Sequence, residues 1–237
     1  QSSGFCGTPT IADIDSDGLN EMIIADKDCY TYIWDTDGDA DLVEWGSYRS
    51  NAQNTGEYRP RCKFSENYTI EIAGSSVTWN SNHHIQGHLI IPAGSTLTVN
   101  ATVSFTPQSK LIIQPGGKLI LDGGTLTNAC GDQWQGVEVW GNPNATQIAA
   151  NQGVLQITNG GRIENAEVAV RVGSENYTTK GGGIIWATNA VIKNNDIGVW
   201  FDPYSYQADN VSFLRYSDFD YDLTLSGEGT FTHVKLN

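Results

Sequence analysis

Basic residues are scarce in this chain: 13 Lys and Arg stand against 27 Asp and Glu, which gives a formal net charge of −14 over 237 residues. A surface of this sign repels the phosphates of nucleic acids and of anionic lipids. No apolar run approaches the roughly 18 residues of a membrane-spanning helix. We therefore expect no binding to nucleic acid and no insertion into a membrane.

Long runs of the helix formers Ala, Leu, Glu and Lys are also missing. In their place the chain has 26 Gly and many Thr, Asn, Val and Ile residues, a composition that favours strands joined by tight turns. Hydrophobic residues make up 39% of the sequence, which suffices for a buried core. We predict an all-β fold.

Familiar catalytic motifs are absent, which leaves several enzyme classes without support. The chain has no Gly-x-Ser-x-Gly, no His-Glu-x-x-His and no phosphate-binding glycine loop. Its four cysteines are not spaced like zinc ligands, and their even number suits two disulfides in an oxidising compartment. We predict the pairs Cys6–Cys29 and Cys62–Cys130.

A first acidic loop lies between two short apolar runs, residues 9–15 and 21–26. Three Asp residues alternate before a turn at Gly18, and a Glu follows. Carboxylates in this arrangement converge on one point, and such oxygen ligands suit calcium (Ca²⁺). The alternative is a solvated turn. We predict a calcium site with these ligands: Asp13, Asp15, Asp17, the backbone carbonyl of Leu19, and Glu21.

Other residues of the N-terminal region indicate which class of calcium-binding domain the loop belongs to. An EF-hand is excluded, because its twelfth loop position needs a bidentate Glu and this chain has Ile24 there. A second acidic stretch, residues 35–41, lacks a strand pattern on its far side, and we expect a charged hairpin turn. With segments 29–35 and 44–58, the first loop resembles the closing blade of a β-propeller of the FG-GAP or VCBS type. The resemblance covers residues 7–58, and it implies calcium binding by Asp13, Asp15, Asp17 and Glu21 and further blades upstream.

The remainder of the chain repeats itself. Residues 91–99 align with 113–121 at a spacing of 22, and residues 153–159 align with 183–189 at a spacing of 30. Apolar residues alternate in segments 167–172 and 196–201, as in strands with one buried face. Units of this length must stack to bury that face. We predict a right-handed parallel β-helix, with a jelly roll as the alternative.

The expected organisation is therefore a calcium-loop blade over residues 1–60, a linker or cap over 61–74 and the β-helix over 75–237. Segment 123–142 resembles the β-helix region of large secreted Bacteroidetes proteins, a likeness that covers residues 75–237. It implies a secreted or cell-surface location, export by type IX secretion machinery and an adhesin-like role. Segment 230–237 looks like a strand without a cap, and we expect further coils.

A β-helix can also carry an enzyme, so a glycoside hydrolase or lyase is one alternative. Hydrolysis needs two carboxylates, and alternate acids of one strand share a face. The candidates are Asp218, Asp220 and Asp222, with Asp196 and Asp202 on the preceding coil. A solvated face or a second calcium site is the competing interpretation. The basic residues that a lyase would need, such as Lys180, Lys193 and Arg215, show no clustering.

A glycan-binding module is the second alternative. Four tryptophans offer faces for sugar rings unless they are buried: Trp134, Trp140, Trp186 and Trp200. His88 with His83 or His84 offers a metal pair, against a plain surface turn. The acidic net charge favours a neutral glycan or a surface protein as partner. Our leading hypothesis is a non-enzymatic, calcium-stabilised extracellular module of structural or adhesin-like function.

Overall fold

The computed structural model describes residues 8–15, 17–28, 30–39, 69–175, 177–206, 209–221 and 231–236. The chain divides into two compact units, Gln1–Arg61 and Cys62–Asn237, which are described separately. Over the described ranges the secondary structure is almost entirely β, with one short helix, α1 (Tyr177–Lys180). The all-β prediction is confirmed. No described helix is long and apolar enough to cross a membrane.

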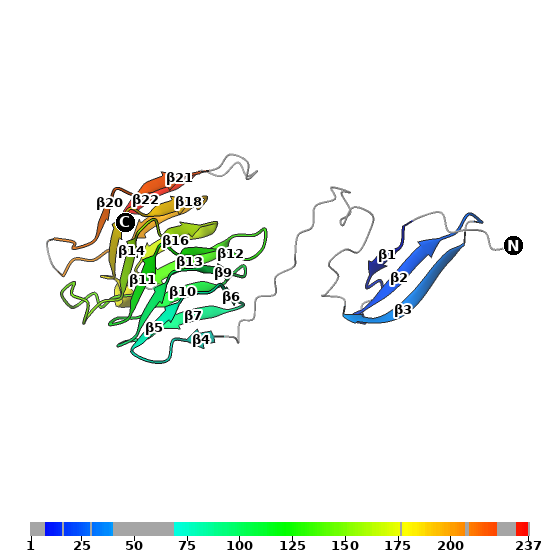
Figure 1. The fold of residues 1–237 in the computed structure, drawn as a ribbon, viewed down its shortest axis with the longest axis horizontal. Helices are drawn as coiled ribbons and strands as arrows, with labels where there is room; N and C mark the ends of the chain where they lie inside the picture. Colours follow the sequence, from blue (N-terminus) through cyan, green and yellow to red (C-terminus); the bar gives the residue numbers. More distant parts are fainter. Residues whose placement is uncertain are drawn as a thin grey trace. The chain divides into compact units, whose positions relative to one another are not determined.

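The first unit contains a three-stranded antiparallel sheet (Figure 1). Its strands are β1 (Thr10–Ala12), β2 (Leu19–Ala25) and β3 (Thr31–Asp39), with β2 in the middle. The first acidic loop joins β1 to β2, so the predicted order of strand, acidic loop and strand is confirmed.

Residues 35–39 of the second acidic stretch belong to strand β3 and do not form the hairpin turn that we expected, and residues 40 and 41 lie outside the described residues. Leu19 pairs with Asp39 and Glu21 with Asp35, and a bulge separates the two pairs. The Asn20 amide donates to the Gly38 carbonyl at 3.2 Å, and the Thr36 hydroxyl donates to the Asn20 carbonyl. These side-chain bonds satisfy backbone groups that the bulge leaves unpaired, which lets β3 continue to Asp39.

The second unit consists of three parallel sheets. Sheet 1 contains β4 (Thr69–Glu71), β7 (His88–Ile91), β10 (Lys110–Ile113), β13 (Trp134–Val139), β16 (Ala166–Val172), β19 (Ile197–Phe201) and β22 (Thr232–Leu236). Sheet 2 contains β5 (Ser76–Trp79), β8 (Thr96–Val99), β11 (Lys118–Asp122), β14 (Val154–Thr158), β17 (Ile184–Thr188) and β20 (Phe213–Arg215). Sheet 3 contains β6 (His83–Ile85), β9 (Thr102–Phe105), β12 (Thr125–Asn128), β15 (Arg162–Glu164), β18 (Val191–Lys193) and β21 (Asp218–Asp220).

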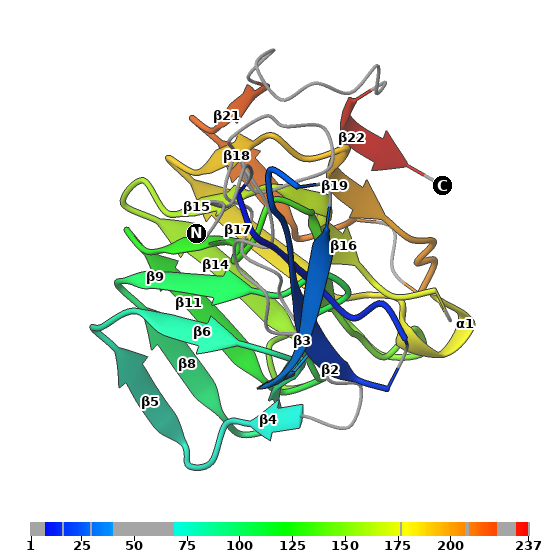
Figure 2. The ribbon, with the colours of Figure 1, turned by 90° about the vertical axis from the view of Figure 1, so that its right-hand side faces the viewer.

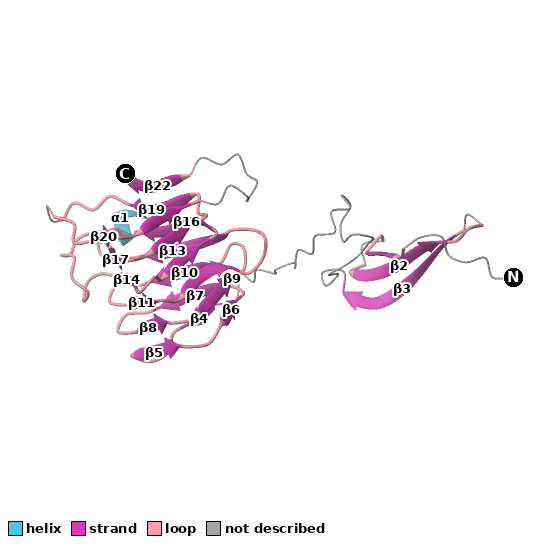
Figure 3. Ribbon diagram, turned by 45° about the horizontal axis from the view of Figure 1, so that its top comes forward, coloured by secondary structure: helices cyan, strands magenta, loops and turns pink. Residues whose placement is uncertain are grey.

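The chain visits the three sheets in turn, and each strand pairs with the strand one coil earlier and one coil later. Figure 2 shows the three sheets around the core, and Figure 3 shows the strands of sheet 1 one above another. The arrangement is compatible with a parallel β-helix. It contradicts the jelly roll, whose strands are antiparallel. The right-handed sense stays a prediction, favoured by the usual hand of parallel crossovers.

The observed register agrees with the sequence repeats. Leu97 pairs with Leu119, and Val99 pairs with Leu121, which is the predicted spacing of 22 residues. The spacing of 30 is confirmed as well, because Leu155 pairs with Ile185. Strand β4 pairs with β7 in sheet 1, so Thr69–Glu71 already belong to the stack, ahead of residue 75 where we expected the β-helix to start.

The core is a set of inward-facing columns that run from coil to coil. On sheet 1 the residues Leu89, Leu111 and Val199 are 0% exposed. Each such side chain contributes about 2 kcal/mol by its burial. Phe105 of sheet 3 stacks on Trp134 of sheet 1, with ring centroids 4.3 Å apart. The columns force the apolar residues to alternate, because every second side chain points inward.

Long loops collect at one corner of the stack, between sheets 1 and 2. The early coils cross this corner in residues 72–75, 92–95 and 114–117, whereas the later coils use residues 140–153, 173–183 and 202–212. Helix α1 belongs to the second of these long loops. Loops that project from a rigid scaffold commonly carry function.

Candidate functional site

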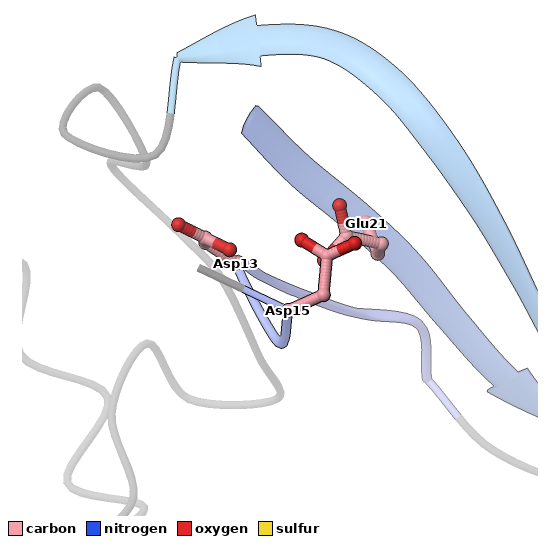
Figure 4. Close-up of side chains that lie close together, drawn as sticks. All are labelled: Asp13, Asp15 and Glu21. Carbon is pink, nitrogen blue, oxygen red and sulfur yellow. The ribbon is translucent and has the colours of Figure 1, made fainter. Parts of the chain in front are cut away.

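The first acidic loop brings three of the predicted ligands together (Figure 4). One carboxylate oxygen from each of Asp13, Asp15 and Glu21 lies within 4.8 Å of the others. Among the described residues, these three form the group of acidic, His or Cys side chains whose ligand atoms lie close enough together to hold a metal ion. Glu21 projects from β2, and the other two acids come from the loop that precedes it.

Backbone hydrogen bonds hold the loop in this shape. The Ile14 N–H donates to Glu21 at 2.8 Å, and the Gly18 N–H donates to Asp13 at 3.1 Å. The Asp17 N–H donates to Asp15 at 3.2 Å. Gly18 has a φ of 91°, a left-handed conformation that suits glycine. Each clustered carboxylate therefore has one oxygen fixed by the loop itself.

The electrostatics of the cluster favour a bound cation. Glu21 is only 3% exposed, and two further carboxylates lie beside it. Like charges at this separation repel one another, and burial weakens the screening by water. An all-oxygen donor set suits a hard cation such as calcium better than zinc or copper. The residues present therefore fit the metal that the sequence predicts.

Asp17 has a different position from the other predicted ligands and is not in the cluster. Its carboxylate accepts the Leu19 N–H at 2.8 Å, which is the bond of an Asx turn. The structure therefore groups three of the four predicted carboxylates, and Asp17 shapes the turn that positions them.

Sequence reasoning missed Asp26, a buried acid after β2. Its carboxylate accepts the N–H groups of Asp28 and Tyr30 at 2.8 and 3.0 Å and the Tyr32 hydroxyl at 2.9 Å. The Tyr30 bond is the main cause that lowers the pKa of Asp26, although burial opposes it. The hydrogen bond from the Tyr32 hydroxyl to Asp26 is the main cause that raises the pKa of Tyr32. This carboxylate fixes the turn that leads into β3. The signal for it in the sequence is an Asp followed by polar turn residues.

The described members of the acids proposed for hydrolysis do not form one cluster. Asp218 and Asp220 share the outer face of sheet 3, as expected, and Phe219 between them faces the core. Lys193 lies 3.4 Å from Asp220. Asp202 follows β19 of sheet 1, so it is not on the same sheet. Asp196 precedes β19 and accepts the side-chain amide of Gln133 at 3.0 Å. Asp222 lies outside the described residues.

The histidines have partners other than a metal. His83 stacks on Trp79 with ring centroids 4.1 Å apart, and the His84 ring contacts the Ser104 hydroxyl at 3.2 Å. The His88 ring accepts the Lys110 N–H at 3.2 Å. These contacts explain the three residues as parts of the coil stack.

Of the four tryptophans proposed for sugar binding, Trp134 is buried and the other three are half-buried. Trp134 is 0% exposed and donates its indole N–H to the Glu164 carbonyl at 3.0 Å. Trp140 carries the ammonium of Lys180 over its ring, and Trp186 donates to the Val211 carbonyl at 3.2 Å. Burial of Trp134 is therefore confirmed, and it offers no face to a sugar.

The outer face of sheet 1, together with residues of the loops that follow its strands, is a polar and aromatic surface that sequence reasoning missed. We call it the sheet 1 strip, and its residues are Lys110, Glu138, Trp140, Arg171, Lys180, Trp200, Asp202 and Lys235. Glu138 pairs with Arg171, Arg171 with Trp200 and Trp200 with Lys235 in the strand register. Only the register across long loops brings these residues together. The available signal was the outward position of each residue in an alternating strand.

Cys130 is disulfide-bonded. Its predicted partner, Cys62, and the other two cysteines lie outside the described residues. The predicted pairs and the oxidising compartment stay predictions.

Comparison with known proteins adds no relative. No protein-family model, no curated protein and no solved structure matches the chain. The likenesses to FG-GAP blades and to secreted Bacteroidetes proteins therefore stay predictions, and function has to be argued from the residues and their geometry.

Proposed function

We propose that the chain belongs to a secreted, cell-surface protein in which a calcium-stabilised FG-GAP or VCBS-type blade precedes a right-handed parallel β-helix. Its function is structural or adhesin-like and not enzymatic. The observation that carries the proposal is the convergence of Asp13, Asp15 and Glu21 on one point. Calcium is the cofactor, held by these three carboxylates.

Both faces of the small sheet support its assignment as a blade. Tyr32 and Trp34 lie on one face, and Ile33 lies on the other because side chains alternate along β3. Trp34 is 43% exposed and Ile33 is 52% exposed. A sheet that is apolar on both faces needs a layer on each side, and neighbouring blades of a propeller provide these layers.

The stack of coils supports a mechanical function. Its interior is apolar from Leu89 on the second coil to Val199 on the sixth, and both side chains are fully buried. Such a solenoid is a stiff element that can present a surface at a distance from its attachment. The disulfide at Cys130 supports an extracellular setting. The Bacteroidetes setting and type IX export rest on the resemblance alone.

Thermal unfolding with calcium or with a chelator tests the calcium assignment. At a calcium concentration of about 100 Kd we expect a gain of about 2.7 kcal/mol for the first unit, because only the folded loop groups the ligands. Asp15→Ala is expected to remove the calcium dependence. Asp37→Ala is the matched control, since Asp37 is an exposed acid of the same sheet outside the cluster. An unfolding transition that ignores both calcium and chelator would contradict the assignment.

A further inference from the structure

The sheet 1 strip differs from the rest of this acidic chain in its local charge. It contains four cations, Lys110, Arg171, Lys180 and Lys235, and two acids, whereas the whole chain has a formal net charge of −14. Sequence-wide charge favoured a neutral partner. The strip is a local exception. The register of sheet 1 aligns Arg171 with Lys235 through Trp200, the Lys110 side chain reaches Glu138, and helix α1 brings Lys180 over Trp140.

Both acids of the strip are already paired with cations. Lys110 contacts Glu138 at 2.9 Å. Arg171 contacts the two oxygens of Asp202 at 2.8 and 3.2 Å, and the Asp202 side chain is fully buried. A two-point Arg–carboxylate contact of this kind is strong and directional. These pairs stabilise the strip and leave no acid for its other cations.

The remaining two cations have aromatic neighbours and no acid. The Lys180 ammonium lies 4.3 Å from the centre of the Trp140 ring, and the Lys235 ammonium lies 3.5 Å from that of Trp200. Neither lysine has an ion pair within the described ranges. Both side chains are partly accessible to solvent. Two positive charges are therefore available to a ligand.

The indole N–H of Trp200 is the second unusual feature. It is buried and has no hydrogen-bond acceptor. By contrast, Trp140 donates to Glu138 at 2.7 Å, and Trp134 and Trp186 donate to backbone carbonyls. A buried donor without an acceptor is costly and rare, and a ligand oxygen would satisfy it once the side chains that cover the N–H shift on binding.

Described residues of the three long loops hydrogen-bond to one another beside the strip. Gln147 of the first loop donates to the carbonyls of Gly182 and Gly183 in the second, at 3.3 and 3.2 Å. The Tyr204 hydroxyl of the third loop donates to the Ala145 carbonyl at 2.6 Å. The three loops therefore support one another, and a supported loop is the usual place for a binding site.

We propose that the sheet 1 strip binds an acidic polysaccharide through its carboxylate groups. Lys180 and Lys235 attract the carboxylates, and the Trp200 N–H donates to a ligand oxygen. The strip runs from β10 to β22, a width of roughly 19 Å at the usual strand spacing, which exceeds a single sugar. Unpaired cations at two places along this width suit a polymer with repeated charges. The inference extends the adhesin-like function proposed above but does not depend on the calcium site.

Calorimetric titration with oligogalacturonates of defined length tests the proposal, with the fully methyl-esterified oligomer as the uncharged control. The intact chain is used, and each titration is repeated in chelator and with Asp15→Ala, so that failure of the calcium site does not affect the result. We expect binding of the acid form alone, and binding that weakens as salt is added. Equal binding of the esterified form, or none of either, would overturn the proposal.

Variants locate the site. Lys180→Gln and Lys235→Gln are each expected to weaken binding roughly threefold to fivefold, as for a partly exposed ionic contact. Lys118→Gln is the matched control, because Lys118 lies over Trp186 on sheet 2 at 5.8 Å, and it is expected to leave binding unchanged. Equal losses of affinity in all three variants would indicate diffuse electrostatic attraction and would overturn the assignment. Tight binding of polyglutamate would also overturn it, because the strip would then be a site for acidic polypeptides.

Trp200→Phe separates ligand binding from a structural function. The variant keeps an aromatic ring but removes the N–H, so we expect weaker binding of the acidic oligomer with little change in Tm. Trp140→Phe is the comparison, since it removes an N–H that donates to Glu138 and is expected to lower the Tm. A Trp200→Phe protein that binds as the native chain does would contradict the assigned hydrogen bond.

Discussion

The two units of this chain reach order by different means. The coil stack has an interior of fully buried apolar columns, with Leu111 at 0% exposure. The small sheet has Ile33 and Trp34 exposed on its two faces, and its order comes from carboxylates such as Glu21 and Asp26. A packed core is insensitive to ions and moderate pH, whereas carboxylate contacts depend on both. The comparison therefore predicts which unit responds to each perturbation.

Truncation of the core is the largest expected effect. Leu111→Ala is expected to destabilise the second unit by about 3 kcal/mol, because it leaves a cavity among fully buried neighbours. The measurement is urea unfolding followed by circular dichroism. Ile120→Ala is the control, since Ile120 faces outward on sheet 2 and is only partly buried. Equal losses of stability in the two variants would contradict the claim that the buried core stabilises the second unit.

Close backbone packing is expected to give the next largest effect. A Cβ at Gly136 would lie 1.7 Å from the Val168 carbonyl oxygen, at the bulge between β13 and β16. We expect Gly136→Ala to cost about 2 kcal/mol in the second unit. Gly160→Ala is the matched variant, because Gly160 also has a positive φ but nothing lies within 4 Å of its added Cβ. Chemical unfolding of the two proteins is expected to show the larger loss at Gly136.

The response to acid is expected to distinguish the two units. The pKa of Asp26 is lowered from its ordinary value of 3.8, so its contribution is present above that value and is lost as pH falls through the lower folded pKa. In chelator, the first unit is expected to lose stability below about pH 4, and Asp26→Asn is expected to flatten that dependence. Unfolding curves over this pH range check the prediction, and an unchanged dependence in the variant would contradict it.

A surface ion pair is expected to give the smallest effect. Lys193 lies 3.4 Å from Asp220, whose side chain is 59% exposed. Asp220→Ala is therefore expected to change stability by less than about 1 kcal/mol. Thermal unfolding checks the magnitude. The same variant tests the hydrolase alternative. If the native chain releases sugar chain ends and Asp220→Ala does not, Asp220 is catalytic.

The sequence predicted features that depend on local pattern. Alternation and a repeated spacing placed Leu97 opposite Leu119, because in a stack the register follows directly from the repeat length. The acidic loop was found because its ligands lie within nine residues of one another. Local chemistry also predicted a hairpin turn at residues 35–41, and for residues 35–39 this was wrong because side chains of β2 and β3 bridge the bulge.

The sheet 1 strip illustrates what local pattern leaves out. Arg171 and Trp200 become neighbours only after a long loop, and so do Trp200 and Lys235. The corner loops lengthen between the early and the later coils, so the sequence alone does not determine which outward residues meet. The same reason explains why Asp202 is paired with Arg171 and not grouped with Asp218.

Calorimetric titration of the chelated chain with calcium tests the central claim most directly. The account predicts saturable binding of one calcium ion per chain, and no such binding after Asp15→Ala, because Asp13, Asp15 and Glu21 form one group of ligands. If the native chain shows no heat of calcium binding, or if Asp15→Ala shows the same heat as the native chain, the calcium-stabilised blade is contradicted.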